Sequence, residues 1–554
     1  MREDLRMNSS PFRRACGRFF RYAAWTGMIV FILVSSVYVY LDWKAEKRWA
    51  AVQAMVKREG ETLALTDLMP PRLPEAENYA AIPELRGINI VEDGNDKKGT
   101  SAAKRQALLD LVSGLEKITP KMYQEFSLGR PPDWPRLMAE LKSTSYITDL
   151  PPAGKEAELF KRTLETKRPL LKVLAESSHR YQQAEWVPAL RDQTLPKHLM
   201  ELKVPHYNAV QMTCRALTLH AIAAAESGDA RAALDDYRAI SLLTRALDRE
   251  PLLIGHLVSL VSNRYGFEVV WSLLRLRGLQ ETDVASLQTL LSSYEPEKSY
   301  LLSLRGELFS GLNSLDALAT DLTGMGMFSL AGATGGAGGF RSWMGRAVPD
   351  SFFTESGASW VELLMEHFIR PMKSQGSWAV VQQQDALDAA LGSGGLFEQP
   401  FDRFFARYVL STTKVVAQRT LHMEALRRQA LVACALERCL IKQGRYPERL
   451  EELVPQYLAS VPLDPVDQLP LRYRQADSGR YRIWCVGMDG VDDEGQVNPG
   501  PGDNPAAILS KPQYQGDWTW QYEPVALPPA VPAAAPKGPG LPPLPGFPSA
   551  PSGS

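Results

Sequence analysis

Two short segments carry the Ser-x-x-Lys pattern, with a lysine three residues after a serine. They are Ser101-Ala102-Ala103-Lys104 and Ser411-Thr412-Thr413-Lys414. In serine acyl-transfer enzymes such a lysine accompanies the nucleophile, so the pattern raises the hypothesis of an envelope hydrolase. No Lys-Thr-Gly accompanies either copy, and the pattern should arise by chance on the order of once or twice in a chain of this length. The sequence therefore identifies no reaction and no catalytic residue.

Histidine and cysteine supply no metal-binding pattern. The seven histidines show no His-Glu-x-x-His and no paired Cys/His spacing, and Glu366-His367 stands alone, so zinc catalysis has no support. The five cysteines are too few and too scattered for a disulfide framework, although Cys434 or Cys439 could reach Cys485 from a packed strand. We expect unpaired, buried thiols. The five are Cys16, Cys214, Cys434, Cys439 and Cys485.

Composition describes an ordinary globular chain long enough for several cores. Its 554 residues are 45% hydrophobic and 23% charged, with a formal net charge of -1. With balanced charge the chain lacks the excess of basic residues with which DNA- and RNA-binding proteins contact phosphates. We expect no nucleic-acid partner.

A membrane helix is the first element that the sequence predicts. Residues 22–41 contain no charge, and twenty residues at about 1.5 Å each span about 30 Å, the thickness of the hydrocarbon core. Aromatic rings suited to the headgroup regions flank the stretch at both ends. They are Trp25, Tyr38, Tyr40 and Trp43.

The flanking charges favour one orientation. Between positions 5 and 21 every charged residue is arginine, which favours a cytoplasmic N-terminus and a translocated C-terminal bulk, although Lys44, Lys47 and Arg48 follow the helix. A cleaved signal peptide is the alternative, but no clear small-x-small site follows the apolar run. The sequence thus predicts a single-pass protein of the bacterial inner membrane with its bulk in the periplasm.

The rest of the chain divides into parts according to its hydrophobic periodicity and its Gly- and Pro-rich breaks. A second uncharged stretch, 322–340, holds seven glycines, so we expect a loop there and no second span. The predicted parts are a cytoplasmic flank (1–21), the membrane helix (22–41), a membrane-proximal helix with an irregular tether (42–103), a helical body (104–320), a Gly-rich loop with further helices (321–400), an α+β head (401–500) and an irregular, Pro-rich disordered tail (501–554). The fold class is mainly α.

Within the body, one helix pair has a recognisable pattern. Ser227-Gly228-Asp229 breaks two apolar helical stretches and predicts an antiparallel αα-hairpin. Its small and aromatic positions resemble a tetratricopeptide helix pair, but no second copy follows at a 34-residue period, and a lone hairpin is the alternative. A helix over 252–263 is too short to cross a bilayer, which makes His256 a core histidine.

The head begins with a long helix from Phe401 to about Gln443, which Gly444 ends. A short helix over 448–454 and two strands flanking Asp477-Ser478-Gly479 follow. Four motifs in this order and spacing resemble the head of the major pseudopilin of type II secretion. They are Gly444-Arg445-Tyr446-Pro447, Pro462-Leu463-Asp464-Pro465, Pro470-Leu471-Arg472-Tyr473 and Gly487-Met488-Asp489-Gly490.

This resemblance covers about residues 425–495, and the whole chain also resembles a group of uncharacterised bacterial membrane-anchored proteins with this ending. By resemblance the loop after the last motif would bind calcium through Asp489, Asp492 and Asp493, since carboxylates suit that ion. A solvated acidic turn is the alternative, because Gln496-Val497-Asn498 replaces the acidic pair that closes the family's loop. No pseudopilin leader segment precedes residue 22, and some 380 residues separate the membrane helix from the head.

Three functions remain open from the sequence. The first is a membrane-anchored envelope protein of structural or interaction type that presents its head to an envelope protein partner. The second is a component associated with a type II secretion or pilus-like machinery. The third is the envelope hydrolase that the Ser-x-x-Lys pattern raises.

Overall fold

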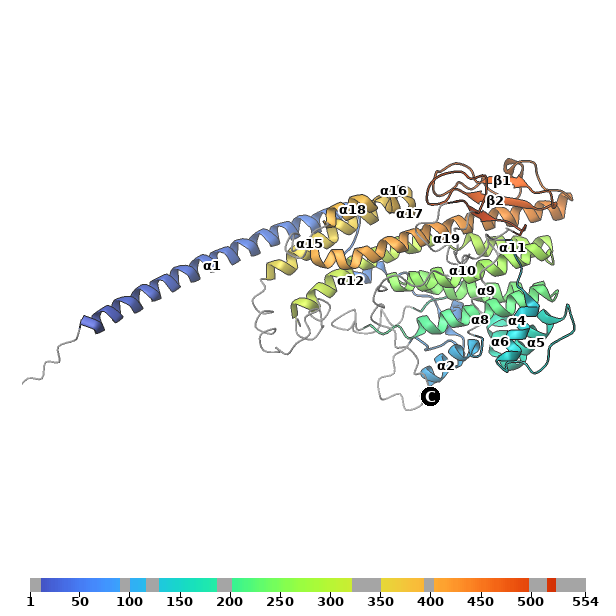
Figure 1. Ribbon diagram of the computed structural model, residues 1–554, viewed down its shortest axis with the longest axis horizontal. Coiled ribbons are helices and arrows are strands. Elements are labelled where there is room, and N and C mark those ends of the chain that lie inside the picture. The colour runs from blue at the N-terminus through green and yellow to red at the C-terminus, as the bar shows by residue number, and fades with distance from the viewer. Residues whose placement is uncertain are drawn as a thin grey trace, which may run out of the picture.

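The computed structural model describes residues 11–89, 100–115, 129–186, 202–320, 350–392, 403–497 and 516–524. The chain is mainly helical, as predicted, with one long apolar N-terminal helix and one small three-stranded sheet. The molecule is elongated: helix α1 projects from one end of the helical body, and the sheet lies at the opposite end (Figure 1). The predicted Gly-rich loop before residue 350 and the Pro-rich stretch after residue 524 lie outside the described residues.

Helix α1 (Pro11–Arg58) is unbroken for 48 residues and therefore contains the predicted membrane helix and its charged continuation. It ends where Gly60 adopts a positive φ of 73°, a conformation that glycine allows at little cost. The residues that follow are irregular, with three short 3-10 turns, η1 (Leu65–Leu68), η2 (Glu75–Glu77) and η3 (Tyr79–Ala81). They are packed rather than free, because Tyr79, Leu85 and Ile88 are fully buried against the body.

The body consists of packed helices, and its centre is the trio α8, α9 and α10. Ser227-Gly228-Asp229 connects α8 to α9 as predicted, and Asp229 caps α9 by accepting from Ala232 N–H at 3.1 Å. Helix α10 packs on both members of the pair. The elements are α2 (Thr100–Leu109), η4 (Asp110–Val112), α4 (Trp134–Ser143), α5 (Glu156–Lys167), α6 (Leu170–Ser178), α8 (His206–Glu226), α9 (Ala230–Asp248), α10 (Leu253–Leu276), α11 (Glu281–Ser292) and α12 (Pro296–Thr320).

A second group of helices packs between α1, α12 and the long helix of the head. Its first member, α15, runs beside α1 and crosses α12 closely: a Cβ at Gly311 would lie 2.2 Å from the Trp360 ring, so only glycine allows this approach. The elements are α15 (Asp350–Leu364), the π-helical turn η7 (Met365–Ile369), α16 (Arg370–Gln375), α17 (Ser377–Gln382) and α18 (Gln384–Leu391).

The long helix α19 (Phe404–Gln443) belongs to the body and the head at once. It packs against α10, α11, α12, α15 and α17, and its last part carries the sheet (Figure 1). Gly444 ends it with φ 72°, as predicted. A 3-10 turn, η9 (Leu450–Leu453), follows where the sequence predicts a short helix, and one continuous hydrophobic core then runs from α1 through the body into the sheet.

The sheet has the order β1-β2-β3, and all pairs are antiparallel. Strands β1 (Arg472–Gln475) and β2 (Tyr481–Cys485) form the hairpin that the sequence predicts. Strand β3 (Trp518–Trp520) lies in the part predicted to be irregular, and it is the element that the prediction missed. It adds to β2 because Trp518 and Trp520 are buried and Trp271 donates to Gln521 O at 2.9 Å, which holds the segment on the body.

Candidate functional site: the membrane anchor and the C-terminal head

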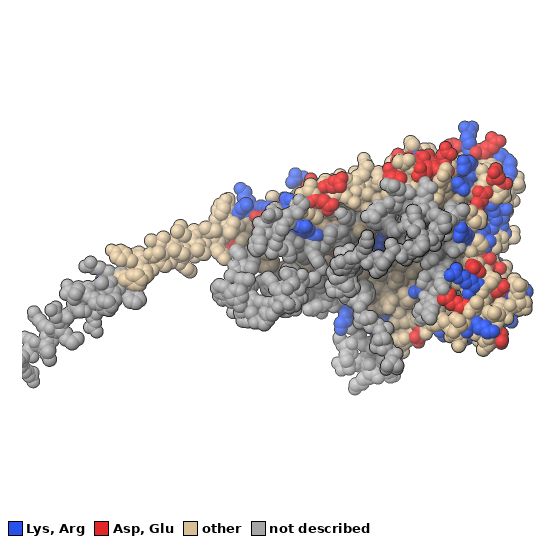
Figure 2. Space-filling view, viewed as in Figure 1, with Lys and Arg blue, Asp and Glu red and all other residues tan. Residues whose placement is uncertain are grey.

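The exposed half of α1 is the most apolar surface of the described chain. Among the described residues, α1 is the one helix long and apolar enough to cross a membrane, with a mean hydropathy of 1.9 in its most apolar stretch. None of that stretch is buried; Phe31, for example, is 71% exposed. Figure 2 shows this projecting part without charged side chains until it nears the body. Leaving such a surface in water is costly, at about 25 cal/mol per Å² of apolar area.

Aromatic and basic side chains lie where this apolar stretch ends. Tyr40 and Trp43 have ring centroids 6.2 Å apart, and Lys47 Nζ lies 5.4 Å from the Trp43 ring. Both rings are more than half exposed. Rings of this kind, with a lysine whose stem lies along them, favour the boundary between hydrocarbon and headgroups.

After the aromatic residues Tyr40 and Trp43, the guanidinium of Arg48 attaches α1 to the body. Ala45, Val52 and Val56 are buried on one side of the helix. Arg48 forms an ion pair with Glu355, and it donates to Ser359 Oγ at 2.9 Å and to Glu362 Oε2 at 2.7 Å. Three acceptors from successive turns of α15 therefore hold one side chain of α1.

The end of α1 is held by a second set of ion pairs. Glu59 pairs with Arg370 at 2.6 Å, and the buried Glu61 accepts from Arg305 at 2.7 Å and from Lys373 at 2.9 Å. Burial opposes ionisation of Glu61, but the hydrogen bonds from Arg305 and Lys373 outweigh it and hold the pKa of the carboxyl below its ordinary value. The C-terminal end of α1 and the residues just after it are thus joined to α12, α15 and α16.

The four motifs of the head meet in one small unit. Tyr473 OH donates to Pro447 O at 2.9 Å, which links the third motif to the first. Asp464 Oδ2 accepts from Val486 N–H at 2.8 Å, which links the second motif to the end of β2. At Gly487 a Cβ would lie 1.9 Å from Gly516 O, so the fourth motif needs glycine where the chain approaches the start of β3.

Arg472 is the charged centre of this unit. Its guanidinium reaches three carboxylates: Asp464 at 2.9 Å, Asp492 at 2.9 Å, and Asp467. Asp464 is fully buried, and burial raises the pKa of its carboxyl to about 6 although backbone N–H groups and Arg472 oppose the shift. Removal of Arg472 would leave a buried carboxylate without its cation.

The three predicted calcium ligands lie in the loop after β2. Asp489 Oδ1 accepts from Val491 N–H at 3.2 Å, and Asp492 accepts from Trp484 Nε1 at 2.9 Å in addition to its ion pair with Arg472. Within the described ranges no group of three or more His, Cys, Asp or Glu is arranged to hold a metal ion. Calcium at Asp489, Asp492 and Asp493 stays a prediction, and residues 498–515 beyond this loop lie outside the described part.

The first of the two Ser-x-x-Lys segments gains no support from the geometry. Ser101 is buried on α2, and Lys104 Nζ donates to Arg86 O at 3.1 Å. Ser411 lies on α19, but its side chain and that of Lys414 are outside the described part. His367, of the isolated Glu-His pair, is buried in η7.

Buried cysteines and histidines fill core positions, as the sequence predicts. The four described cysteines, at 214, 434, 439 and 485, are free and buried. His256 lies between Ser299 Oγ and Thr420 Oγ1, each 2.9 Å from a ring nitrogen, and burial lowers the pKa of its ring to about 3. Burial also lowers the pKa of His422 to about 3. Both rings are therefore neutral at pH 7.

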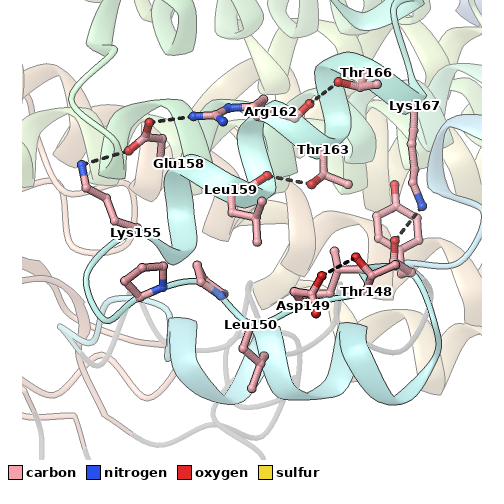
Figure 3. Close-up of a pocket in the computed structure, with 14 residues that line it drawn as sticks. Thr148, Asp149, Leu150, Lys155, Glu158, Leu159, Arg162, Thr163, Thr166 and Lys167 are labelled. Carbon is pink, nitrogen blue, oxygen red and sulfur yellow. Dashed lines mark hydrogen bonds and ion pairs between the residues drawn. The ribbon is translucent and has the colours of Figure 1, made fainter.

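One open pocket of about 730 Å³ lies between α5 and the loop before it (Figure 3). Along α5, Glu158 pairs with Lys155 and with Arg162, each at 3.0 Å, and Lys167 Nζ donates to Tyr146 O at 2.6 Å. These charged groups are engaged with one another, and Lys155 and Arg162 are largely exposed. The pocket is open to solvent and therefore lacks the enclosure of a typical ligand site.

No protein-family model, curated protein or solved structure matches this chain.

Several residues that join the parts of the molecule could not be found from the sequence. Arg48 and Glu61 are ordinary members of a charged helix end, and only their distant partners give them a role. Asp517, which accepts from Gly495 N–H at 2.6 Å and ties β3 to the acidic loop, lies in the part predicted to be irregular. The alternation Trp518-Thr519-Trp520 is the one signal that predicts a short strand there.

Proposed function

We propose that this chain is a single-pass membrane protein of structural or interaction type that holds its helical body and its head in a fixed position at a membrane. One observation carries the proposal: α1 is unbroken from an uncovered apolar stretch to a segment locked into the body by Arg48 and Glu61. A flexible tether would leave the position of the body open, whereas a continuous helix fixes it.

The bacterial inner membrane, with the N-terminus in the cytoplasm and the bulk in the periplasm, is the location that we propose. The support is the flank before the helix, in which arginine is the only charged residue type from position 5 to 21. Positive charges beside a first membrane helix favour the cytoplasmic side.

Membrane fractionation with topology reporters tests the anchor and its orientation separately. We expect the full chain in the membrane fraction after an alkaline carbonate wash. A phosphatase fused after residue 554 should be active, and a fluorescent protein that matures only in the cytoplasm should be dark at the same position. Recovery of the intact chain from cytosol without detergent would refute the anchor. The opposite reporter pattern would refute only the orientation.

A second proposal concerns the partner of the head. We propose that the head packs against a pseudopilin of a type II secretion or pilus-like machinery, and the convergence of the four motifs on one helix-and-sheet unit supports it. An unpaired edge of a sheet is a surface on which another chain can add, and β1 and β3 are the two edges here.

Co-purification from detergent extracts tests this partner. We expect a fibre protein to be recovered with the full chain and to be lost when β1 carries Gln475→Pro, because the N–H of residue 475 points away from β2 towards the open edge. The matched change Asp477→Pro lies in the hairpin turn and should have a smaller effect. Equal recovery with both variants would exclude docking on β1.

A further inference from the structure

The distance between the predicted membrane span and the body is set by the register of α1. The span ends at Leu41, and Ala45, four residues later, is only 1% exposed. Because α1 has no break there, these four residues correspond to about 6 Å along the helix axis. Each headgroup layer is about 5–7 Å thick. The body therefore begins at the depth of the headgroups.

Helix α15 extends the body back towards the span. It runs parallel to α1, because Arg48 contacts Glu355 and Glu59 contacts Arg370. A Cβ at Gly357 would lie 4.0 Å from the Trp49 ring, which places these two residues at the same level. The first turn of α15 lies about five residues earlier, level with about residue 44 of α1.

Helix α12 ends at the same level. It runs antiparallel to α15, since Glu307 O accepts from Trp360 Nε1 at 3.1 Å and Leu315 lies against Gly357. Figure 1 shows the ends of α12 and α15 reaching back along α1. The chain leaves α12 and enters α15 at this end, and the sequence between them is uncharged from 322 to 340.

At this end the exposed Glu46 lies beside aromatic and basic side chains. On α1 these are Trp43, 56% exposed, and the exposed Lys44 and Lys47. On α15, Phe352 is half-buried, and its ring meets Phe353 edge to face with centroids 5.2 Å apart. We call Trp43, Lys44, Lys47 and Phe352 the membrane-facing edge. Aromatic rings and lysines are enriched at this depth, where the rings face the hydrocarbon boundary and the amines face phosphate.

We propose that the membrane-facing edge contacts phospholipid headgroups, so that the body is seated on the bilayer. This inference rests on the proposed membrane span of α1 and adds a second contact, made by α15. The occupant is a phospholipid surface because the edge is continuous with the apolar stretch of α1 and begins within one headgroup layer of its end.

Site-specific quenching in liposomes of phosphatidylcholine and phosphatidylglycerol tests the contact. The full chain carries Cys16→Ser and one introduced cysteine to which a fluorophore is attached. The chain with Cys16→Ser alone keeps the four buried native cysteines and measures the background labelling. The probes are Phe352→Cys at the edge, Val34→Cys in the proposed span and Ser478→Cys in the turn between β1 and β2. These two strands lie at the opposite end of the molecule from α1 (Figure 1). The quencher is a lipid with a nitroxide on its headgroup, and a second lipid carries it in the acyl chain.

We expect at least about twofold stronger headgroup quenching at position 352 than at position 478, and acyl-chain quenching at position 34. Equal, weak quenching at 352 and 478, with position 34 quenched, would overturn the seated body and leave the span intact. Absence of quenching at position 34 would overturn the proposed span itself. If thermal melting shows that Phe352→Cys is unfolded, Thr354→Cys in the first turns of α15 is used as the probe instead.

Discussion

Arg48 of α1 donates to Glu362 of α15 at 2.7 Å, across 314 positions of the sequence. With Glu355 and Ser359 it forms the contact that joins the long apolar helix α1 to the body. The side chain is 28% exposed, so water screens this contact only in part.

Arg48→Ala should destabilise the protein by about 1–3 kcal/mol, because Glu355 and Glu362 lose a shared cation. The measurement is the thermal unfolding midpoint of the full chain in mild detergent. Glu46→Ala, two residues away on the exposed side of α1, is the control and should change the midpoint little. Equal shifts for the two variants would show that the ion pair does not hold α1.

Truncation at two positions separates the span from the docked part of α1. A chain of residues 42–554 keeps Val52, Val56 and the ion pairs, and we expect it to be soluble and folded. A chain of residues 59–554 exposes the apolar face that α1 covers and should aggregate or unfold. Gel filtration and circular dichroism measure both. Similar behaviour of the two chains would contradict a structural role for residues 42–58.

Arg472→Gln should destabilise the head by about 3 kcal/mol, because it leaves the buried Asp464 without its cation. Denaturant unfolding of the full chain, followed by circular dichroism and tryptophan fluorescence, measures the loss; three of the twelve tryptophans, Trp484, Trp518 and Trp520, lie in the sheet. The control is Arg474→Gln on the same strand, where the side chain is exposed. A loss no larger than that of the control would mean that the carboxylates are satisfied without Arg472.

Calcium binding through Asp489, Asp492 and Asp493 predicts a stability that depends on the ion. Chelation should lower the unfolding midpoint, and added calcium should restore it. At a free calcium concentration one hundred times the dissociation constant, the bound ion should add about 2.7 kcal/mol to the free energy of unfolding. Asp489→Asn should abolish the response, whereas Asp477→Asn in the hairpin turn should keep it. An unchanged midpoint with and without calcium would favour the solvated acidic turn.

Acid should destabilise the fold through His256 and His422. Burial lowers the pKa of each ring to about 3, against about 6.5 in the unfolded chain. The folded state therefore binds fewer protons than the unfolded state between these values. The contribution of each histidine to the free energy of unfolding is fully present above pH 6.5. As the pH drops from 6.5 towards 3, each histidine lowers that free energy by about 1.4 kcal/mol per pH unit.

The pH dependence of His256→Gln tests this origin. This variant should lose stability less steeply between pH 6.5 and 5 than the parent, whatever its stability at pH 7. His179→Gln, on the exposed surface, should keep the parent slope. An unchanged slope in His256→Gln would assign the acid sensitivity to other groups.

The long apolar N-terminal helix, the end of α19 at Gly444, the β1–β2 hairpin and the buried cysteines could all be predicted from the sequence. Each depends on residues close together in the chain: a run without charge, a glycine that allows positive φ, or a turn between alternating strands. The transfer of side chains from water and the local backbone energy decide such features, and both can be evaluated from a short window.

Only the tertiary structure decided how these parts are joined. Arg48 meets Glu355 across 307 positions, Glu61 meets Arg305 across 244, and β3 adds to β2 from a segment with no strand prediction. The packing of whole helices determines these contacts, and many distant carboxylates would suit each arginine equally well on chemical grounds. For the same reason the sequence suggests a separate head and a tether, whereas a single core joins α1, the body and the sheet.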